Sequence, residues 1–178
     1  VDIDLEAMAG GSSKGGYKEY MEKETYEQPG AISRTKDGRI GGEDVLDNIF
    51  GIGSTELISK VGRIQIVACG TSLHAGRVAA NWLSSIAELP CQIDYASEYR
   101  YRNPHVDKNS LLITISQSGE TADTLAALNY AKEKNYLSTL TICNVPTSSL
   151  ARESDFSLFT NAGPEIGVAS TKAFTTQL

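Results

Sequence analysis

Residues 111–125, LLITISQSGETADTL, begin with a short apolar run that is followed at once by a polar turn and a helical pattern. We predict a buried strand over residues 111–115 and a helix from residue 122. A strand that turns directly into a helix leaves free backbone N–H groups at the helix start, where the positive end of the helix dipole also lies. The stretch therefore predicts a site at which an anion can bind.

The side chains of this turn favour phosphate as the anion. Ser116, Ser118 and Thr121 supply hydroxyl groups, Gln117 supplies an amide, and Gly119 lets backbone approach a ligand closely. The alternative is a plain helix cap, which accounts for one hydroxyl but not for three within six residues. Neither G-x-x-x-x-G-K-[ST] nor G-x-G-x-x-G is present, so the turn is not a P-loop and a dinucleotide is not indicated.

Further strand–helix units surround this stretch and define the fold class. Repeated β-α-β units imply an α/β fold of three layers, α/β/α, with a parallel sheet of five strands. Right-handed crossovers leave a few orders, of which we choose the flavodoxin-like order 2-1-3-4-5. The predicted strands are residues 64–69, 91–95, 111–115, 139–143 and 156–160, and the helices are residues 73–88, 97–101, 122–134, 148–153 and 170–178.

The chosen strand order brings hydroxyl-rich turns together. Strands 1 and 3 become neighbours whose connections leave in opposite directions, and the crevice at their carboxyl ends is the expected ligand site. Gly70, Thr71 and Ser72 follow strand 1, next to the turn that begins at Ser116. Residues 165–172 form a third such loop before the last helix, for which Ser170 or Thr171 is the expected N-cap.

The N-terminal part of the chain differs in composition from the strand–helix units. We interpret residues 1–16, which contain GGSSKGG, as a linker, and residues 17–60 as a helical segment before a domain over residues 61–178. A helix over residues 17–28 is expected to end or kink at Pro29 and to pack against the domain through Tyr17, Tyr20 and Met21. Weaker helical patterns cover residues 32–36 and 45–60. The chain does not begin with Met and stops within a helical pattern, so we expect further residues on both sides.

The composition of the chain restricts the classes of partner and the kind of location that can be expected. The 178 residues, 40% of them hydrophobic, suffice for one α/β domain with an extension, and no apolar run approaches the ~20 residues of a membrane-spanning helix. A net charge of −6 argues against nucleic acid. Cys69, Cys91 and Cys143 lie in or beside apolar runs, which favours buried reduced thiols and a cytoplasmic location. No metal site and no cofactor are indicated.

Five stretches together resemble the isomerase part of the glutamine–fructose-6-phosphate aminotransferases, also called glucosamine-6-phosphate synthases, which is a tandem of two sugar-isomerase (SIS) domains. The first helix departs from the family at Thr25, where an apolar residue is usual. SQSGET alone would indicate only a SIS domain, whereas EQP with GVASTKAFTTQL narrows the resemblance to this family. The stretches are EKETYEQP (22–29), ACGTS (68–72), SQSGETADT (116–124), CNVPTSSLARESD (143–155) and NAGPEIGVASTKAFTTQL (161–178).

The resemblance implies an enzyme that makes glucosamine 6-phosphate from fructose 6-phosphate and glutamine, of which this chain is the first SIS domain. It implies an upstream glutaminase domain, a second SIS domain in the same chain, a homodimer, and sugar phosphates as ligands (fructose 6-phosphate, glucose 6-phosphate or glucosamine 6-phosphate). No nucleic acid or membrane partner is implied. The residues implied to hold the sugar phosphate are Gly70, Thr71, Ser72, Ser116, Gln117, Ser118, Thr121, Val168, Ala169 and Ser170.

The same resemblance assigns the reacting lysine, glutamate and histidine to the second SIS domain or the C-terminal tail, so no catalytic residue is expected here and the fragment is expected to be inactive alone. His74 is given no role, and His105 is expected to be exposed in a loop. We expect Lys172 to be exposed on a helix face and Cys69 to be a packed thiol rather than a nucleophile.

Two other functions stay open from the sequence. The first is a non-catalytic SIS module that senses a sugar phosphate for a regulator, although no helix-turn-helix pattern is visible. The second is a stand-alone phosphosugar isomerase, which needs a base within the chain. Only Glu98, Glu120 and Glu165 stand at strand ends where they could serve. Loss of a second domain would also expose an apolar face through which copies of the fragment could associate.

Overall fold

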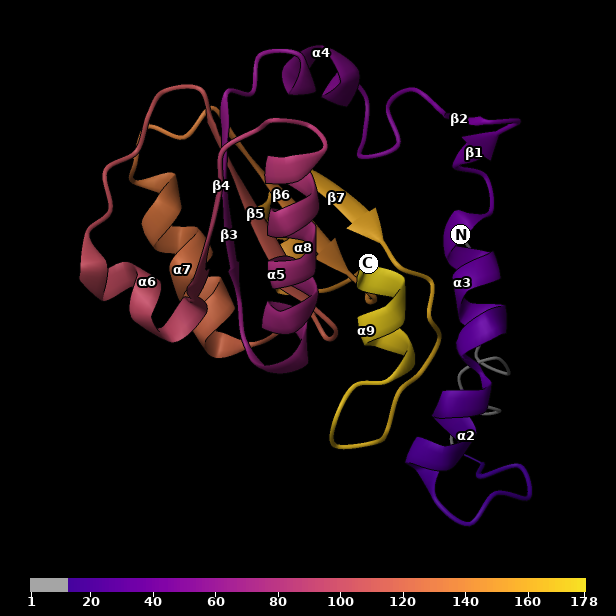
Figure 1. The fold of residues 1–178 in the computed structure, drawn as a ribbon. Helices are drawn as coiled ribbons and strands as arrows, with labels where there is room; N and C mark the ends of the chain where they lie inside the picture. Colours follow the sequence, from indigo (N-terminus) through magenta and orange to yellow (C-terminus); the bar gives the residue numbers. More distant parts are fainter. Residues whose placement is uncertain (1–12) are drawn as a thin grey trace.

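Five parallel strands form the centre of the molecule, and they lie in the predicted order (Figure 1). The computed structural model describes residues 13–178, so most of the predicted linker over residues 1–16 lies outside the described residues. The order β4-β3-β5-β6-β7 corresponds to 2-1-3-4-5 along the chain, which confirms the prediction. The strands are β3 (Arg63–Ala68), β4 (Cys91–Tyr95), β5 (Ser110–Ser116), β6 (Ser138–Cys143) and β7 (Phe156–Phe159).

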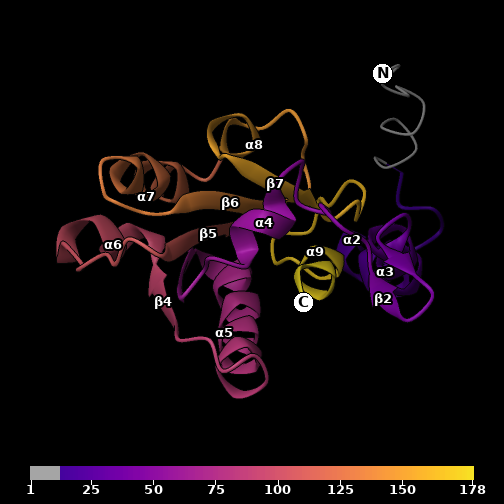
Figure 2. The same cartoon turned by 90° about the horizontal axis from the view of Figure 1, so that it is seen from above.

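Helices cover both faces of this sheet, as Figure 2 shows in a view along the strands. On one face lie α5 (Gly70–Ser85) and α9 (Lys172–Gln177). The other face is covered by α6 (Ala96–Arg102), α7 (Ala122–Lys132) and α8 (Ser149–Glu153). The predicted three-layer α/β/α architecture is therefore confirmed.

The alternation of side chains along each strand divides the core into two clusters. Ile64 and Ile66 of β3 belong to the cluster under α5, whereas Val67 belongs to the cluster with α6 and α7. In β5 every residue is buried, because both faces of this central strand are covered. This explains why β5 is a continuous apolar run rather than an alternating one.

The N-terminal segment contains more than helices. It consists of α2 (Tyr20–Tyr26), α3 (Gln28–Lys36), a short hairpin of β1 (Ile40–Gly41) and β2 (Asp44–Val45), and α4 (Ser54–Ile58). Pro29 lies in the first turn of α3, where its missing N–H costs nothing. The predicted helical pattern over residues 45–60 was wrong at its beginning, since Val45 pairs with Ile40 in the hairpin. α3 lies beside α9 in both views (Figures 1 and 2).

The predicted packing of α2 against the domain through its aromatic stripe holds only in part. Met21 lies against Gly167 of the domain, but it is 43% exposed. Tyr17 is 36% exposed, and its ring stacks on Tyr26 within the same segment, with ring centroids 5.6 Å apart. The buried residue of α2 is Glu24, so a polar contact accompanies the expected apolar one.

α5 begins three residues before the predicted start. Gly70, at φ +56°, is its first residue, so Thr71 and Ser72 lie in the first turn of the helix. Glycine tolerates this left-handed backbone conformation, which other residues rarely adopt. Within residues 13–178, no helix combines the length and the apolar character that crossing a membrane requires.

Candidate functional site

The turn between β5 and α7 is held by its own hydroxyl groups. Ser116 Oγ accepts a hydrogen bond from the Gly119 amide at 3.0 Å and lies 3.1 Å from Thr121 Oγ1. Ser118 Oγ accepts from the Glu120 amide at 3.2 Å. Thr121 occupies the N-cap position of α7, but its side chain makes no capping hydrogen bond. The simple cap therefore does not account for the three hydroxyls, which instead fix the shape of the turn before the helix begins.

Gly119 and Glu120 attach this turn to α8. Gly119 has φ +66°, and a Cβ there would lie 2.1 Å from Ser148 Oγ, so no larger residue fits without displacement. Glu120 Oε1 accepts from the Ser149 amide at 2.6 Å. This hydrogen bond lowers the pKa of the Glu120 carboxyl. Glu120 thus acts at the start of α8 and is not directed at a ligand.

The turn between β3 and α5 brings the start of a second helix to the same end of the sheet. α5 has 16 residues and begins at Gly70, directly after the extended backbone of Cys69. Ser72 in its first turn is only 6% exposed, and Thr71 is half-buried. Because β3 and β5 are neighbours, the starts of α5 and α7 and their dipoles lie at one edge of the sheet.

The third loop, residues 165–171, ends at α9 with a carboxylate in place of the expected hydroxyl cap. Glu165 Oε1 accepts from the amides of Thr171 and Ala173 at 2.9 and 3.2 Å. Thr171 is the N-cap residue, but its side chain makes no capping hydrogen bond. The prediction that Ser170 or Thr171 caps the helix was therefore right about the position and wrong about the capping group.

Lys172, the first residue of α9, is not exposed as predicted. It is 3% exposed, and its Nζ lies 2.5 Å from Glu27 Oε2 at the junction of α2 and α3. A buried ammonium requires such a partner, and the partner lies 145 residues away in the sequence.

These three loops line a single crevice of about 410 Å³ at the carboxyl ends of the strands. No lysine, arginine, histidine, aspartate or glutamate is among the lining residues, so an anion would be held by hydroxyls, amides and helix dipoles. All ten residues predicted from the sequence are in the lining; their contact with a ligand stays a prediction. The lining consists of Cys69, Gly70, Thr71, Ser72, Ile115, Ser116, Gln117, Ser118, Thr121, Val168, Ala169 and Ser170.

The acid–base groups considered from the sequence lie outside this crevice. Glu98 lines a different cavity, with Arg77 and Arg102. Glu120 and Glu165 are engaged by backbone amides, as described above. His74 is exposed on α5, and His105 is exposed beside Asp107, at 3.2 Å. The crevice therefore has the groups that bind an anion, and the described residues that line it supply no carboxylate, imidazole or amine to transfer protons.

The cysteines are free thiols. Cys143 is buried, whereas Cys69 and Cys91 are half-buried, so the prediction of three buried thiols was too strong. Burial raises the pKa of Cys91 to about 11 and also raises that of Cys143. Neither is a reactive thiolate at neutral pH.

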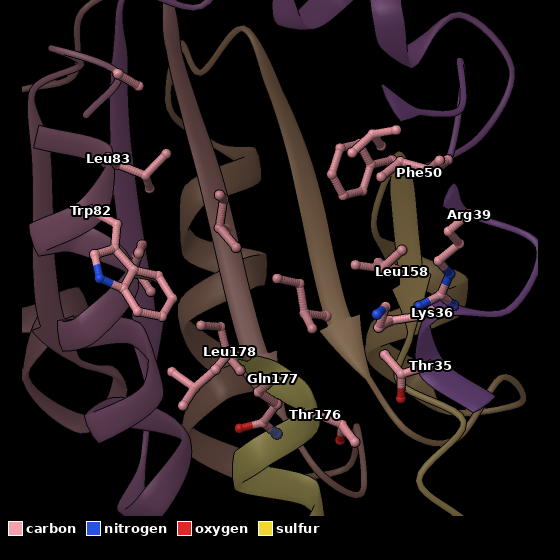
Figure 3. Close-up of a pocket in the computed structure, with 18 of the residues that line it drawn as sticks. Thr35, Lys36, Arg39, Phe50, Trp82, Leu83, Leu158, Thr176, Gln177 and Leu178 are labelled. Carbon is pink, nitrogen blue, oxygen red and sulfur yellow. The ribbon is translucent and has the colours of Figure 1, made fainter. Parts of the chain in front are cut away.

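A larger cavity of about 590 Å³ lies on the α5 face of the sheet, and Figure 3 shows it. We call it the apolar groove. Trp82 and Leu83 of α5 line one side and Phe50 and Leu158 the other, while the end of α9 enters it through Thr176, Gln177 and Leu178. Thr35, Lys36, Arg39, Thr176 and Gln177 also line the groove, but most of its exposed wall is apolar. It therefore resembles a site for an apolar group more than a site for a sugar phosphate.

Comparison with known proteins agrees with this geometry. Residues 57–178, more than half of the chain, match the family described as "SIS domain". The chain belongs to this family.

Within it, the chain is similar to glutamine–fructose-6-phosphate aminotransferases, which confirms the resemblance noted in the sequence. It is 60% identical to the enzyme of Pseudomonas aeruginosa over 94% of the chain and 57% identical to that of Escherichia coli K12 over 99%. The chain spans only 27% and 29% of the length of these relatives.

Solved structures show the same fold. The C-terminal domain of glucosamine-fructose-6-phosphate aminotransferase from Francisella tularensis superposes with a TM-score of 0.90 at 52% identity, covering 93% of this chain and 46% of that one. Tagatose-6-phosphate ketose/aldose isomerase from Escherichia coli shares the fold, with a TM-score of 0.72 at 24% identity, over 90% of this chain and 46% of that one.

Proposed function

We propose that the crevice binds the phosphate group of a six-carbon sugar phosphate. The observation that carries the proposal is the convergence of three polar loops on one crevice. Among residues 13–178, the groups there that suit an anion are hydroxyls, the Gln117 amide, backbone amides and two helix starts. The turn over residues 116–121 holds the phosphate. The first turn of α5 and the loop over residues 165–171 then form the walls beside the sugar.

The substrate class follows from the relatives. Their name describes an aminotransferase that acts on fructose 6-phosphate with glutamine. We propose that this chain is the first SIS domain of such an enzyme, which makes glucosamine 6-phosphate for amino-sugar synthesis. Fructose 6-phosphate, glucose 6-phosphate and glucosamine 6-phosphate are the expected ligands, because they share the phosphate and the six-carbon skeleton.

The isolated chain is proposed to bind but not to convert its ligand. Isomerisation of a sugar phosphate requires a group that moves a proton between neighbouring carbons. Within the part of the chain that the structure describes, no carboxylate, imidazole or amine that could do so lines the crevice. The catalytic groups would come from the second SIS domain and the C-terminal tail of the complete enzyme.

The domain organisation of the complete enzyme is also proposed from its similarity to these relatives. The chain spans about a quarter to a third of its relatives, which leaves room for a glutaminase domain before residue 1 and a second SIS domain after residue 178. Residues 1–16 would then be the linker to the first, residues 17–60 a helical segment and residues 61–178 the SIS domain. A homodimer in the cytoplasm is the proposed state of the complete enzyme.

Calorimetric titration with glucose 6-phosphate, fructose 6-phosphate and unphosphorylated glucose tests the proposal. Both phosphosugars are expected to bind and glucose is not. Ser118→Ala, which removes a hydroxyl from the turn, is expected to weaken binding roughly 10–100-fold, the usual cost of losing a hydrogen bond to a charged group. Ser85→Ala, on the exposed end of α5 away from the crevice, is the matched control. Equal affinity for glucose and glucose 6-phosphate, or no binding by folded protein, would refute the proposal for this chain.

A further inference from the structure

Glu24 is a buried carboxylate whose partners lie in the third wall of the crevice. It is 2% exposed, although most of α2 around it is open to solvent. Its Oε1 accepts from the amides of Ile166 and Gly167 at 2.6 and 3.0 Å, and its Oε2 lies 3.2 Å from the Gly167 amide. Burying a carboxylate is costly unless hydrogen bonds replace the lost water, and two backbone amides do so here.

The loop backbone lies directly against α2 at this point. A Cβ added to Gly167 would lie 2.5 Å from Glu24 Oε2 and 2.8 Å from Met21 Cγ. No side chain fits between the loop and the helix, and glycine permits this approach. The position of residues 166–167 is therefore set by the position of the Glu24 carboxylate.

The loop is held at both ends, and the lining residues lie between. Glu24 holds the amides of Ile166 and Gly167, and Glu165 holds those of Thr171 and Ala173. Residues 168–170, which line the crevice, follow the first pair directly. Val168 is fully exposed, so no packing of its own side chain fixes this part of the loop.

Other contacts fasten the helices to α9 rather than to the loop. Glu27 pairs with Lys172, and Gln28 accepts a hydrogen bond from Thr175 Oγ1. These contacts fix where α2 and α3 stand against α9. Glu24 alone among these three residues bonds to the backbone that leads into the crevice lining.

We propose that Glu24 is a positioning residue of the sugar-phosphate site: by holding the amides of Ile166 and Gly167, it sets residues 168–170 at the distance from the phosphate turn that a six-carbon sugar requires. This inference rests on the proposed function and adds a residue that does not touch the crevice. The phosphate turn over residues 116–121 makes no use of α2. Loss of Glu24 therefore affects contacts with the sugar and not those with the phosphate.

The test compares the affinities of two ligands for variants of this chain. Calorimetry measures the affinity for glucose 6-phosphate, and competition with glucose 6-phosphate measures that for inorganic phosphate. Glu24→Ala is expected to weaken the binding of glucose 6-phosphate about tenfold or more, while the affinity for inorganic phosphate stays within about twofold of the wild-type value. Glu24→Gln keeps one acceptor oxygen and is expected to restore much of the affinity. Gly167→Ala, which pushes the loop away with Glu24 intact, is expected to resemble Glu24→Ala. Glu22→Ala, an exposed glutamate on the same helix, is the control and is expected to match the wild type.

The outcomes separate this inference from the proposed function. A wild type that binds neither ligand would overturn both. Wild-type binding together with unchanged glucose 6-phosphate affinity in Glu24→Ala would overturn the positioning role alone. An equal loss of affinity for both ligands in a folded Glu24→Ala or Gly167→Ala protein would also overturn the positioning role, because a general structural defect does not distinguish the sugar from the phosphate. If Glu24→Ala does not fold, Glu24→Gln and Gly167→Ala decide the question by the same comparison.

Discussion

The crevice is lined by residues just before α9 and the apolar groove by residues at the end of α9, and the two cavities differ in the chemistry of their walls. The groove is the larger, at about 590 Å³ against about 410 Å³, but its walls are almost entirely hydrocarbon. The crevice has hydroxyls and amides that are fixed by hydrogen bonds to one another. Convergence of polar groups, and not volume, therefore identifies the candidate binding site in this fold.

The two cavities also differ in how firmly their walls are held. In the crevice, Gly119 is wedged against Ser148, and the loop over residues 165–171 is held by Glu24 and Glu165. In the groove, Trp82 and Leu178 are 44% and 46% exposed. The floor of the groove is buried at Ile66 and Ile115, so only its rim is loosely held. A substitution at Gly119 should therefore cost more stability than one at the exposed rim of the groove.

The largest effect is expected for Gly119→Ala. The positive φ costs about 1–2 kcal/mol and the forced contact with Ser148 about 1–3 kcal/mol, so urea unfolding should show a loss of roughly 2–5 kcal/mol. Gly38→Ala is the matched control, because Gly38 has φ +69° against +66° for Gly119 but nothing within 4 Å of the added Cβ. Equal losses in the two variants would mean that Ser148 does not restrict the turn.

A smaller effect is expected for Glu27→Ala, which leaves Lys172 buried without its partner on the helix between the two cavities. Removal of one member of a largely buried pair should cost about 2–3 kcal/mol in the free energy of unfolding at pH 7. Glu56→Ala, which breaks the exposed Glu56–Lys60 pair, should change stability much less.

The Glu27 pair also predicts a pH dependence. Burial raises the pKa of Glu27, but the hydrogen bond and charge of Lys172 outweigh it, so the pKa lies below its ordinary value. A carboxyl with a lowered folded pKa contributes stability above its unfolded pKa of about 4 and loses it as the pH falls through the folded value. Wild-type stability should therefore fall more steeply below about pH 4 than that of Glu27→Ala. Parallel curves would contradict this assignment.

The smallest effect is expected in the groove. Trp82→Ala should cost only about 1 kcal/mol, because the indole is already nearly half exposed. Since Trp82 is the single tryptophan, its fluorescence reports on this cavity. An uncharged apolar dye such as N-phenyl-1-naphthylamine should bind in the groove and quench Trp82, and saturating glucose 6-phosphate should not displace it. Displacement would show that the two cavities are one site.

The sheet could be predicted because its signals are local. Apolar runs such as residues 111–115 identify strands, and the handedness of crossovers restricts their order. The same rule predicts from the sequence that Ser72 and Ser116 share one crevice, because the carboxyl ends of neighbouring parallel strands meet. The hairpin of β1 and β2 was missed because two-residue strands carry almost no pattern.

Glu24 and Lys172 could not be interpreted from sequence for a different reason. Each looks like an ordinary exposed charge on a helix, and nothing within several residues indicates burial. Their partners are 142 and 145 residues away. The local sequence gives one indication of the Glu24 contact. Gly167 stands between Ile166 and Val168, and a single glycine at such a place is typical of a close backbone approach.

These long separations have a consequence for the order in which the molecule assembles. All five strands of the sheet, β3 to β7, lie within residues 63–159, so they can pair once this part of the chain has been made. The contacts of α2 and α3, in contrast, require residues 166–175. Contacts of such high sequence separation form late, because closing the loop costs entropy before any contact is gained. A chain emerging from the ribosome can therefore complete its sheet and two hydroxyl turns while the third wall is still open. Within this domain, the wall that faces the sugar would form after the turns that hold the phosphate.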